Sequence, residues 1–340
     1  MVGIGVIGLG FMGAMHLRAL EKVNGAKLVA ICNPSGRRLD GDFSGVAGNI
    51  AGASPMQLDM SVVRGYKDFD EMLANPDVQV VDICAPTPSH EELAIAALKA
   101  GKHVICEKPL ARHAETARRI QAAAESASGY FLPAMCLRFW PEWAYAKQLT
   151  GSETYGKLLA ARFRRVAEPP GWGHSKYFDG AASGGGLFDL HIHDTDVVQW
   201  LFGRPKAVFS QGYAKVSGAV DHVVTQYVTD SGATVSAEGS WAMTPGFGFT
   251  MAYTLQFERA TLDYDFSRTD GPLKLVVDDG STHTLSFGGN DGYIGELQYM
   301  TDCVAQGKAP ETVTVADAVQ AVEICEAEER SVASGQLETL

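Results

Sequence analysis

The chain begins with the stretch Val2-Gly3-Ile4-Gly5-Val6-Ile7-Gly8-Leu9-Gly10-Phe11-Met12-Gly13, in which an apolar run leads into the pattern GxGxxG. A helical pattern follows, from Ala14 to Val23. In this setting the first glycine permits a tight turn, the second lets a pyrophosphate approach the backbone, and the third lets helix and strand pack closely. The helix N-terminus then faces the phosphates. The stretch predicts a dinucleotide site that includes Gly8, Gly10, Phe11, Met12 and Gly13.

Short apolar runs alternate with helical patterns from residue 1 to about residue 138, which is typical of βαβ units around a parallel sheet. The predicted strands are Val2–Ile7, Lys27–Cys32, Val78–Cys84, His103–Cys106 and Tyr130–Leu137. The predicted helices are Ala14–Val23, Phe69–Leu73, Glu91–Ala100 and Ala114–Ala127. Residues Gly41–Pro55 are rich in Gly, Ala and Ser where a second helix would normally lie, so we expect an irregular loop there.

After Gly203, strand patterns follow one another without intervening helices, which predicts a largely antiparallel sheet. The predicted strands are Lys206–Val216, His222–Thr229, Ala233–Ala242, Phe249–Phe257, Ala260–Phe266, Leu273–Asp278 and Thr282–Phe287, and helices are predicted at Gly295–Gln306 and Val315–Ser334. The fold class is therefore α/β, with a doubly wound Rossmann sheet in residues 1–138. A second, α+β domain with a large open sheet is predicted in residues 139–340.

The composition of the chain excludes some classes of binding partner and indicates a cellular compartment. With 28 Lys and Arg against 40 Asp and Glu, the net charge of −12 argues against nucleic acid and acidic membrane surfaces as partners. The six cysteines are scattered without a CxxC pair, so we interpret them as reduced residues, mainly of the core. No basic segment precedes the first apolar run, and no apolar stretch approaches the roughly 20 residues of a membrane span. The sequence predicts a cytoplasmic protein.

The end of the second predicted strand bears on cofactor choice. An NAD enzyme places an Asp or Glu there, about 20 residues after the glycines, to bind the ribose hydroxyls. Here the position is Asn33, followed by Ser35, Arg37 and Arg38. Neutral donors and nearby positive charge favour a 2′-phosphate, so NADP is the preferred cofactor. NAD remains the alternative, with Asn33 binding the ribose and both arginines solvated.

Two further strand ends are broken by prolines, and ligands of open parallel sheets bind beyond such carboxyl ends. The first is Ala85–His90, where Pro86, Thr87 and His90 are candidates for cofactor contact; His90 has packing as its alternative. The second is Glu107-Lys108-Pro109. We expect Glu107 and Lys108 near the cofactor, with Lys108 where nicotinamide and substrate would meet.

A Gly-rich segment, Gly184-Gly185-Gly186, leads into a helical pattern that contains Asp189 and His193. A spacing of four places these two on one helix face, where a carboxylate can fix an imidazole tautomer and raise its basicity. The glycines are expected to let the backbone approach a ligand. A metal site formed by His191, His193, Asp194 and Asp196 is disfavoured, because a spacing of two does not converge on one face. No metal is predicted.

With these motifs in this order, the chain resembles the glucose-fructose oxidoreductase, inositol dehydrogenase and rhizopine-catabolism (Gfo/Idh/MocA) family. Further motifs that support the resemblance are Asn75-Pro76-Asp77-Val78, Arg138-Phe139 and Trp200-Leu201-Phe202-Gly203. The resemblance implies a sugar or polyol substrate, with Lys108 on the reacting hydroxyl, His193 as acid/base and Asp189 binding substrate or supporting His193. It also implies homodimers or homotetramers joined through the open sheet of the second domain.

Other residues are candidates for the sugar pocket, with an ordinary core or surface role as the alternative. They are Trp143, Arg165, Trp172, Gly173, His174 and Tyr177. Three functions compete: a sugar or cyclitol dehydrogenase using NAD(P), a glycosidase that oxidises its substrate transiently with bound NAD, and a non-catalytic dinucleotide sensor. The presence of both Lys108 and His193 favours the dehydrogenase.

Overall fold

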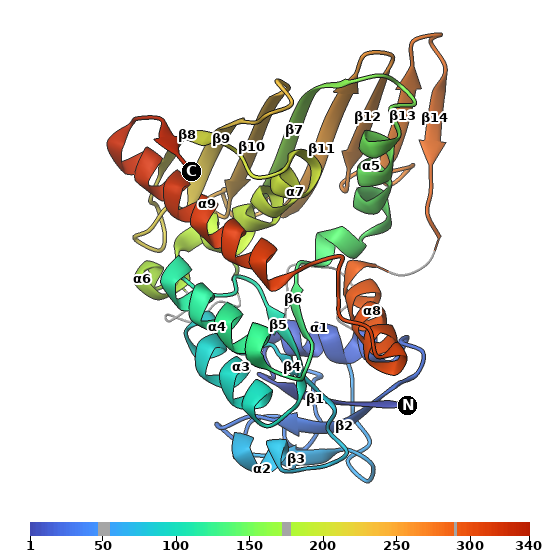
Figure 1. The fold of residues 1–340 in the computed structure, drawn as a ribbon, viewed down its shortest axis with the longest axis vertical. Helices are drawn as coiled ribbons and strands as arrows, with labels where there is room; N and C mark the ends of the chain where they lie inside the picture. The colour runs from blue at the N-terminus through green and yellow to red at the C-terminus, as the bar shows by residue number, and fades with distance from the viewer. Residues whose placement is uncertain (47–54, 172–177, 289–290) are drawn as a thin grey trace. The chain divides into compact units, whose positions relative to one another are not determined.

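The computed structural model describes residues 1–46, 55–171, 178–288 and 291–340 (Figure 1). The chain divides into two compact units. Unit 1 comprises Met1–Phe139 and Asn290–Val319, and unit 2 comprises Trp140–Gly289 and Gln320–Leu340. The predicted second domain, residues 139–340, therefore differs from the structure, because residues 290–319 return to the first unit. The cause is helix α8 (Gly292–Gln306), whose buried residues pack against helix α1 (Phe11–Leu20).

Unit 1 contains a six-stranded sheet in the order β3-β2-β1-β4-β5-β6, and every pair is parallel. The strands are β1 (Val2–Ile7), β2 (Ala26–Cys32), β3 (Arg64–Tyr66), β4 (Val80–Ile83), β5 (His103–Glu107) and β6 (Phe131–Ala134). All residues of β1 and β4 are buried, as expected for a parallel sheet covered on both faces. The strand order reverses between β1 and β4, which is where such sheets bind ligands.

The helices of unit 1 follow the predicted alternation. They are α1, α2 (Phe69–Leu73), α3 (His90–Lys99), α4 (Ala114–Ser126) and α8, with short 3₁₀ turns at Thr87–Ser89 and Cys136–Phe139. Most of the predicted loop Gly41–Pro55 lies outside the described residues; residues 41–46 and 55, which are described, contain no helix. In place of the predicted strand end at Leu137, β6 stops at Ala134 and the 3₁₀ turn begins at Cys136.

Unit 2 contains a nine-stranded sheet in the order β14-β13-β12-β11-β7-β10-β9-β8-β15. Only the β7 and β10 pairing is parallel among these described strands. The strands are β7 (Leu158–Ala167), β8 (Ala207–Tyr213), β9 (His222–Val228), β10 (Thr234–Ser240), β11 (Phe249–Phe257), β12 (Ala260–Asp265), β13 (Leu273–Val277), β14 (Thr282–Leu285) and β15 (Glu338–Thr339). Burial alternates along β9 and β12, so one face is covered and the other is not.

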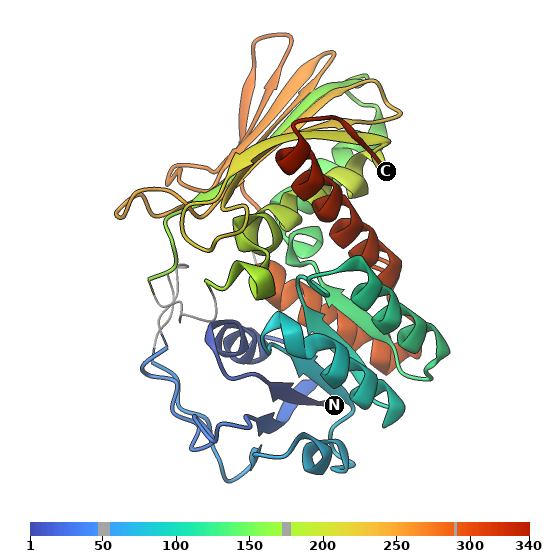
Figure 2. The same ribbon diagram turned by 90° about the vertical axis from the view of Figure 1, so that its left-hand side faces the viewer.

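The helices of unit 2 lie against one face of this sheet (Figure 2). They are α5 (Pro141–Ser152), α6 (Gly180–Ser183), α7 (Ile192–Phe202) and α9 (Val315–Ser334), whose first turn belongs to unit 1. A π-helical turn, Leu187–His191, leads directly into α7. The buried Trp143 of α5 packs against Tyr253 with ring centroids 4.8 Å apart, which favours a core role over the predicted place in a sugar pocket.

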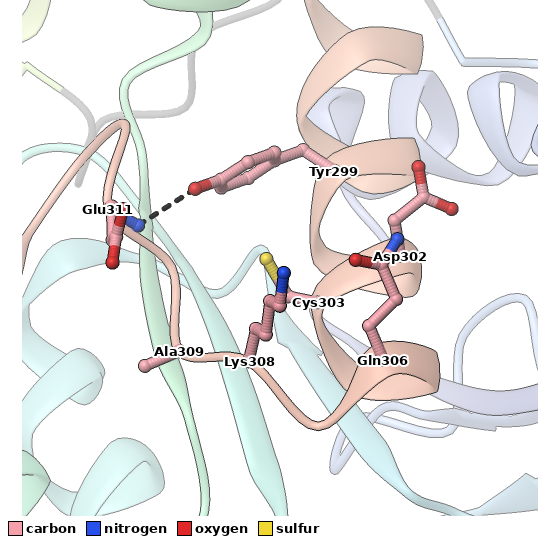
Figure 3. A pocket seen from close by; sticks show the side chains of 7 residues that line it. All are labelled: Tyr299, Asp302, Cys303, Gln306, Lys308, Ala309 and Glu311. Carbon is pink, nitrogen blue, oxygen red and sulfur yellow. Dashed lines mark hydrogen bonds between the residues drawn. The ribbon is translucent and has the colours of Figure 1, made fainter.

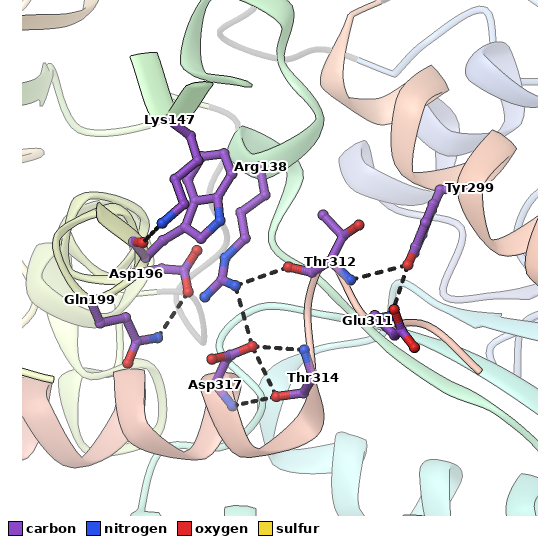
Figure 4. Close-up of polar contacts among 10 residues, drawn as sticks. Arg138, Lys147, Asp196, Gln199, Tyr299, Glu311, Thr312, Thr314 and Asp317 are labelled. Carbon is purple, nitrogen blue, oxygen red and sulfur yellow. Dashed lines mark hydrogen bonds and ion pairs between the residues drawn. The ribbon is translucent and has the colours of Figure 1, made fainter. Parts of the chain in front are cut away.

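The buried Arg138 side chain fixes the end of the first segment of unit 1 (Figure 4). Its Nη1 donates to the Thr312 carbonyl at 3.0 Å and to Asp317 Oδ2 at 3.2 Å. The same carboxylate accepts from the backbone N–H and the hydroxyl of Thr314, which caps the start of α9. The Arg138-Phe139 motif therefore holds the chain that follows α8.

All six cysteines are unbridged, and five of them are buried. This agrees with their interpretation as reduced residues, mainly of the core. Within the described part of the chain, none of the helices combines the length and apolar character needed to traverse a bilayer.

Candidate active site

The three glycines of the first loop have three different environments. A Cβ on Gly8, whose φ is +93°, would lie 2.4 Å from the Ala85 nitrogen, and one on Gly13 would lie 2.1 Å from the Gly8 carbonyl oxygen. A Cβ on Gly10 would meet nothing within 4 Å. Gly8 and Gly13 therefore allow tight packing, whereas Gly10 leaves open space beside the N-terminus of α1.

The start of α1 is suited to an anionic group. Gly10 is its N-cap and supplies no side-chain hydrogen bond, and the first turn contains no acidic residue. Phe11 and Met12, the predicted cofactor neighbours, are partly buried at this end of the helix. Backbone amides at a helix N-terminus attract phosphate oxygens. The loop and helix therefore fit the pyrophosphate of a dinucleotide.

The turn after β2 is organised by the Asn33 side chain. Asn33 Nδ2 donates to the Arg37 carbonyl at 2.8 Å, and the Ser35 hydroxyl donates to Asn33 Oδ1 at 2.9 Å. Arg37 is exposed, whereas Arg38 Nη1 donates to the carbonyl of Leu9 at 2.9 Å. Arg38 thus links this turn to the glycine loop, and Arg37 extends toward solvent.

The loop after β4 and the loop after β5 are held together by His90. Its Nε2 and Nδ1 lie 2.9 and 3.0 Å from the carbonyl oxygens of Ala85 and Pro109. The ring is 1% exposed, and burial lowers the pKa of His90 despite the carbonyls and the Glu107 charge. These contacts favour the packing alternative for His90. Pro86 and Thr87, in contrast, are exposed and partly exposed at the same loop.

Lys108 follows the last residue of β5, and its backbone is held by the preceding side chain. The Lys108 N–H donates to Glu107 Oε2 at 3.0 Å, and Lys108 itself is partly exposed. Glu107 is only 5% exposed. Burial alone would raise the pKa of Glu107, but the interaction with His16, whose Nε2 lies 3.1 Å from Glu107 Oε1, together with Lys108, holds it below its usual value. Glu107 therefore contacts the Lys108 backbone, and its predicted contact with the cofactor stays a prediction.

His16 was not among the sequence-predicted site residues. It lies on α1, three positions after Gly13, and is fully buried among Asp82, Glu107 and Glu296. The signal available in the sequence was a histidine on the apolar face of the helix that follows GxGxxG. Its carboxylate neighbours come from distant parts of the chain, so pattern reasoning did not connect them.

In unit 2, the Gly-rich segment packs against its own unit. A Cβ on Gly184 would lie 2.6 Å from the Phe188 ring, and Cβ atoms on Gly185 and Gly186 would lie 2.7 and 2.6 Å from the carbonyl oxygens of Val220 and Asp221. All three glycines are buried. Neighbouring protein atoms therefore require glycine at these three positions, and the approach of a ligand to their backbone stays a prediction.

Asp189 and His193 lie on either side of the junction between the π-helical turn and α7. Both are partly exposed, whereas the residues immediately before and after each of them are buried. A π-helical turn widens the helix locally and is frequent at functional sites. The two side chains are therefore the accessible polar groups of an otherwise buried segment.

The other polar residues of this segment have separate partners within unit 2. Arg165 Nε and Nη2 donate to Asp194 at 3.1 and 3.3 Å, Gln199 donates to Asp196 at 2.9 Å, and His191 Nε2 lies 3.4 Å from Glu328. The pKa of Asp194 lies above its usual value because burial outweighs the charges of Arg165 and His191. Arg165 is 3% exposed, which favours a role beneath α7 over the predicted sugar contact.

The remaining sugar-pocket candidates, Trp172, Gly173, His174 and Tyr177, lie outside the described residues. A separate pocket of about 490 Å³ lies in unit 1 between the end of α8 and the loop that follows it (Figure 3). It is lined by Tyr299, Asp302, Cys303, Gln306, Lys308, Ala309 and Glu311. None of the sequence-predicted site residues belongs to this lining.

The glycine loop and the strand order define a Rossmann domain of the dinucleotide-binding type. Residues 2–134 match the model of the oxidoreductase family with an NAD-binding Rossmann fold, and residues 143–263 match that of the GFO/IDH/MocA C-terminal domain. The chain belongs to the GFO/IDH/MocA family. The resemblance stated from the sequence is confirmed.

Two relatives are similar to this chain in sequence, and one solved structure is similar to it in fold. The chain is 32% identical over 240 residues to a myo-inositol 2-dehydrogenase of Thermotoga maritima, covering 68% of this chain and 66%, just under two thirds, of that protein. It is 26% identical to a scyllo-inositol 2-dehydrogenase (NAD(+)) of Bacillus subtilis, covering 94% and 90% of the two chains. A levoglucosan dehydrogenase in complex with NADH has the same fold, with a TM-score of 0.84, 22% identity and coverage of 99% and 98%.

Proposed function

We propose that this protein is a dehydrogenase that transfers a hydride between NAD(P) and a hydroxyl-bearing carbon of a sugar or cyclitol. The carrying observation is the position of Lys108, which is held through its backbone at the carboxyl end of β5 in a unit with a dinucleotide-type glycine loop. The names of the two inositol dehydrogenases support the substrate class. An alcohol is also the substrate for which a lysine, an imidazole and a carboxylate together supply the required chemistry.

Each proposed catalytic residue has a distinct task. Bound nicotinamide supplies the hydride acceptor when an alcohol is oxidised. Lys108 donates to the reacting oxygen and stabilises the negative charge that develops there. His193 takes the hydroxyl proton, because imidazole titrates near neutral pH without a large shift. Asp189 binds a neighbouring hydroxyl or orients His193. Under this proposal Arg165 acts indirectly, by fixing α7 through Asp194.

We propose NADP as the preferred cofactor. The turn from Asn33 to Arg38 contains no carboxylate, and the exposed Arg37 supplies positive charge where a 2′-phosphate would be recognised. Asn33 and Ser35 are held in fixed orientations by their mutual hydrogen bond. The relative from Bacillus subtilis is named for NAD(+), so the two cofactors are the first comparison to make.

We also propose a homodimer or homotetramer formed through the uncovered face of the nine-stranded sheet. Val224 and Val228 of β9 are 42% and 46% exposed on this face, and Val276 of β13 is 40% exposed. Light scattering of the purified protein should give a mass above the 36.4 kDa of one chain. A Val224→Lys, Val228→Lys variant should shift the mass toward one chain, and a monomeric unmodified protein would contradict the proposal.

The function is tested with a panel of aldoses, ketoses and inositols, each assayed with NAD and NADP at the nicotinamide absorbance band. A positive result is cofactor reduction that depends on one class of polyol and on Lys108. Turnover of none of the panel by a protein that binds NADPH would contradict the dehydrogenase proposal. The same result would favour the non-catalytic dinucleotide sensor.

A further inference from the structure

Four elements of unit 1 bring charged side chains around the buried His16 ring. Nδ1 lies 2.9 and 3.1 Å from the two oxygens of Asp82, at the middle of β4. Nε2 lies 3.1 Å from Glu107 Oε1, at the end of β5, and 3.5 Å from Glu296 Oε1, on α8. His16, Asp82 and Glu296 are fully buried. We refer to these four residues as the His16 cluster.

The geometry determines where the protons of the cluster reside. A neutral imidazole has one N–H and one lone pair, so carboxylates on both ring nitrogens require a second proton, on the ring or on an acid. Burial alone would lower the pKa of His16, but the charge of Asp82, with Cys84 and the hydrogen bonds they make, raises it well above 6.5. The imidazolium is therefore the stable form beside Asp82 and Glu107.

Glu296 differs from the other two acids. Neither of its carboxyl oxygens has a hydrogen-bond partner among the described residues, although both are buried. Burial raises the pKa of Glu296 well above its usual value. The charge of His16 opposes this effect, whereas the negative charges of Glu107 and Asp82 add to it. The cluster thus combines a His16 ring that favours the cation and a Glu107 that favours the anion with a Glu296 that favours the neutral acid. Other titratable groups face the cluster: Cys84 directly after β4, His90 at the start of α3, Cys106 on β5, Lys108 after β5, and Asp291 and Tyr293 at the start of α8.

The link from the cluster to the site is the Glu107 carboxylate, because each of its oxygens has a separate partner. Oε1 faces His16 Nε2 at 3.1 Å, and Oε2 accepts the Lys108 N–H at 3.0 Å. A carboxylate fixed by a cation on one oxygen presents the other in a defined direction. The backbone at Lys108 is thereby tied to α1, which begins at the glycine loop.

We propose that His16 is a positioning residue of the active site, holding Glu107 as an imidazolium so that Glu107 fixes the backbone from which Lys108 extends. This inference rests on the proposed function of Lys108. It assigns His16 no contact with substrate or cofactor. Misplacement of a catalytic group by about 1 Å can cost roughly a hundredfold in rate, so loss of this support should reduce turnover more than binding.

The first experiment compares His16→Gln with Glu107→Gln. A glutamine at 107 has one acceptor oxygen where the carboxylate has two, so it cannot accept hydrogen bonds from both a His16 imidazolium and the Lys108 N–H. Each variant should lower kcat roughly tenfold or more, with KM and the Kd for NADPH changed less than about threefold. The double variant should lose no more than the worse single variant, because both changes break the same link. His103→Gln, a partly buried histidine at the opposite end of β5, is the matched control and should retain kcat.

The second experiment reads His16 directly and needs no substrate. In ¹⁵N spectra of the full-length protein, assigned by loss of the signals in His16→Gln, both ring nitrogens should show imidazolium shifts at pH 8, where an ordinary histidine is neutral. Glu296→Gln should keep those shifts, since the amide replaces a neutral acid. A neutral His16 ring at pH 8 overturns the inference, as does one equivalent of metal in the purified protein.

The two proposals can fail separately. Normal kcat in folded His16→Gln and Glu107→Gln, together with a large loss in Lys108→Ala, would overturn the role of His16 and leave the proposed function intact. Normal kcat in Lys108→Ala would contradict the proposed function. If His16→Gln does not fold, the more conservative Glu107→Gln tests the inference. A lower kcat with a nearly unchanged Kd for NADPH would support it, and a normal kcat would overturn it.

Discussion

Arg165 of β7 binds both carboxylate oxygens of Asp194 on α7 through Nε and Nη2, at 3.1 and 3.3 Å, with both side chains almost completely buried. The pair ties the central strand of unit 2 to the helix that contains His193. Removing one member of a buried pair leaves the other charge without compensation, which is more costly than removing both. The position of α7 therefore depends on a contact that does not involve the candidate site itself.

Arg165→Met should lower the free energy of unfolding by about 3–5 kcal/mol, because Asp194 stays buried without its cation. Adding Asp194→Leu should recover part of that loss. Arg162→Met, on the same strand but with a 69% exposed side chain, is the control and should change the unfolding free energy by less than about 0.5 kcal/mol. Urea denaturation measures all four proteins. Equal losses in the single and double variants would show that the ion pair is not the relevant contact.

Asp221 gives unit 2 a stability that depends on pH. Its carboxylate accepts from the backbone N–H groups of Lys215 and Ser217 at 2.7 and 3.0 Å, and from the Trp241 indole. Burial alone would raise the pKa of Asp221, but hydrogen bonds from the Ser217 hydroxyl, from the Val216 and Lys215 N–H groups and from the Trp241 indole lower it below its usual value. A lowered pKa contributes stability above the unfolded value, and this contribution is lost as the pH falls through the folded value.

Asp221→Asn should therefore lower the melting temperature near neutral pH. It should also reduce the fall in melting temperature as the pH is lowered. The amide NH₂ would face backbone donors, and hydrogen bonds to a charged group contribute about 1.5–3 kcal/mol. Melting curves from pH 3 to 7 measure both effects. Asp230→Asn, at an exposed carboxylate of the same unit, is the control. Parallel pH profiles for Asp221→Asn and the unmodified protein would rule out this role.

The sequence predicted most elements of the fold because their apolar periodicity is clear. Strand β7 was not predicted, since Arg162, Arg164 and Arg165 interrupt its apolar pattern. In the structure Arg164 pairs across the sheet with Glu238 and Arg165 pairs with Asp194. These compensating charges come from distant segments, which local patterns do not reveal.

In the candidate site, too, some features follow from local sequence patterns and others depend on contacts between distant segments. The glycine loop and the strand-end position of Lys108 follow from local spacing. Local spacing does not explain why residues 184–186 are glycines. The atoms that these glycines accommodate belong to Phe188 and to the loop at Val220 and Asp221. His16 also required the folded structure, since its three acidic neighbours come from β4, β5 and α8.

Arg37 and Arg38 should affect the two cofactors differently. Arg37 is exposed, so Arg37→Ala should weaken NADP binding about tenfold and leave NAD binding almost unchanged, as expected for loss of a charge-assisted contact to a phosphate. Arg38 donates to Leu9 in the glycine loop, so Arg38→Ala should weaken both cofactors. Fluorescence titrations with NADH and NADPH give the affinities. Equal affinity of the unmodified protein for both would contradict the NADP preference.

Lys108 should be required for turnover and not for folding. Lys108→Ala removes the side chain and keeps the backbone N–H that Glu107 accepts. The melting temperature and the Kd for NADPH should therefore be unchanged, while kcat falls about a hundredfold or more through loss of a positioned donor. Lys99→Ala, at an exposed lysine of α3, is the control. Full activity of Lys108→Ala would remove this residue from the mechanism.

His193 and Lys108 are rival candidates for the base in alcohol oxidation, and the pH profile of kcat distinguishes them. A histidine base must be neutral, so the rate should rise with pH through an apparent pKa near that of imidazole. His193→Gln should cost roughly 10² to 10⁴ in kcat and abolish this lower limb. If Lys108 is the base and His193 only binds a neighbouring hydroxyl, the limb should persist in His193→Gln with a smaller loss. Asp189→Asn should shift the limb to lower pH, because the partner carboxylate stabilises the imidazolium. His283→Gln, at an exposed histidine of β14, should reproduce the unmodified profile.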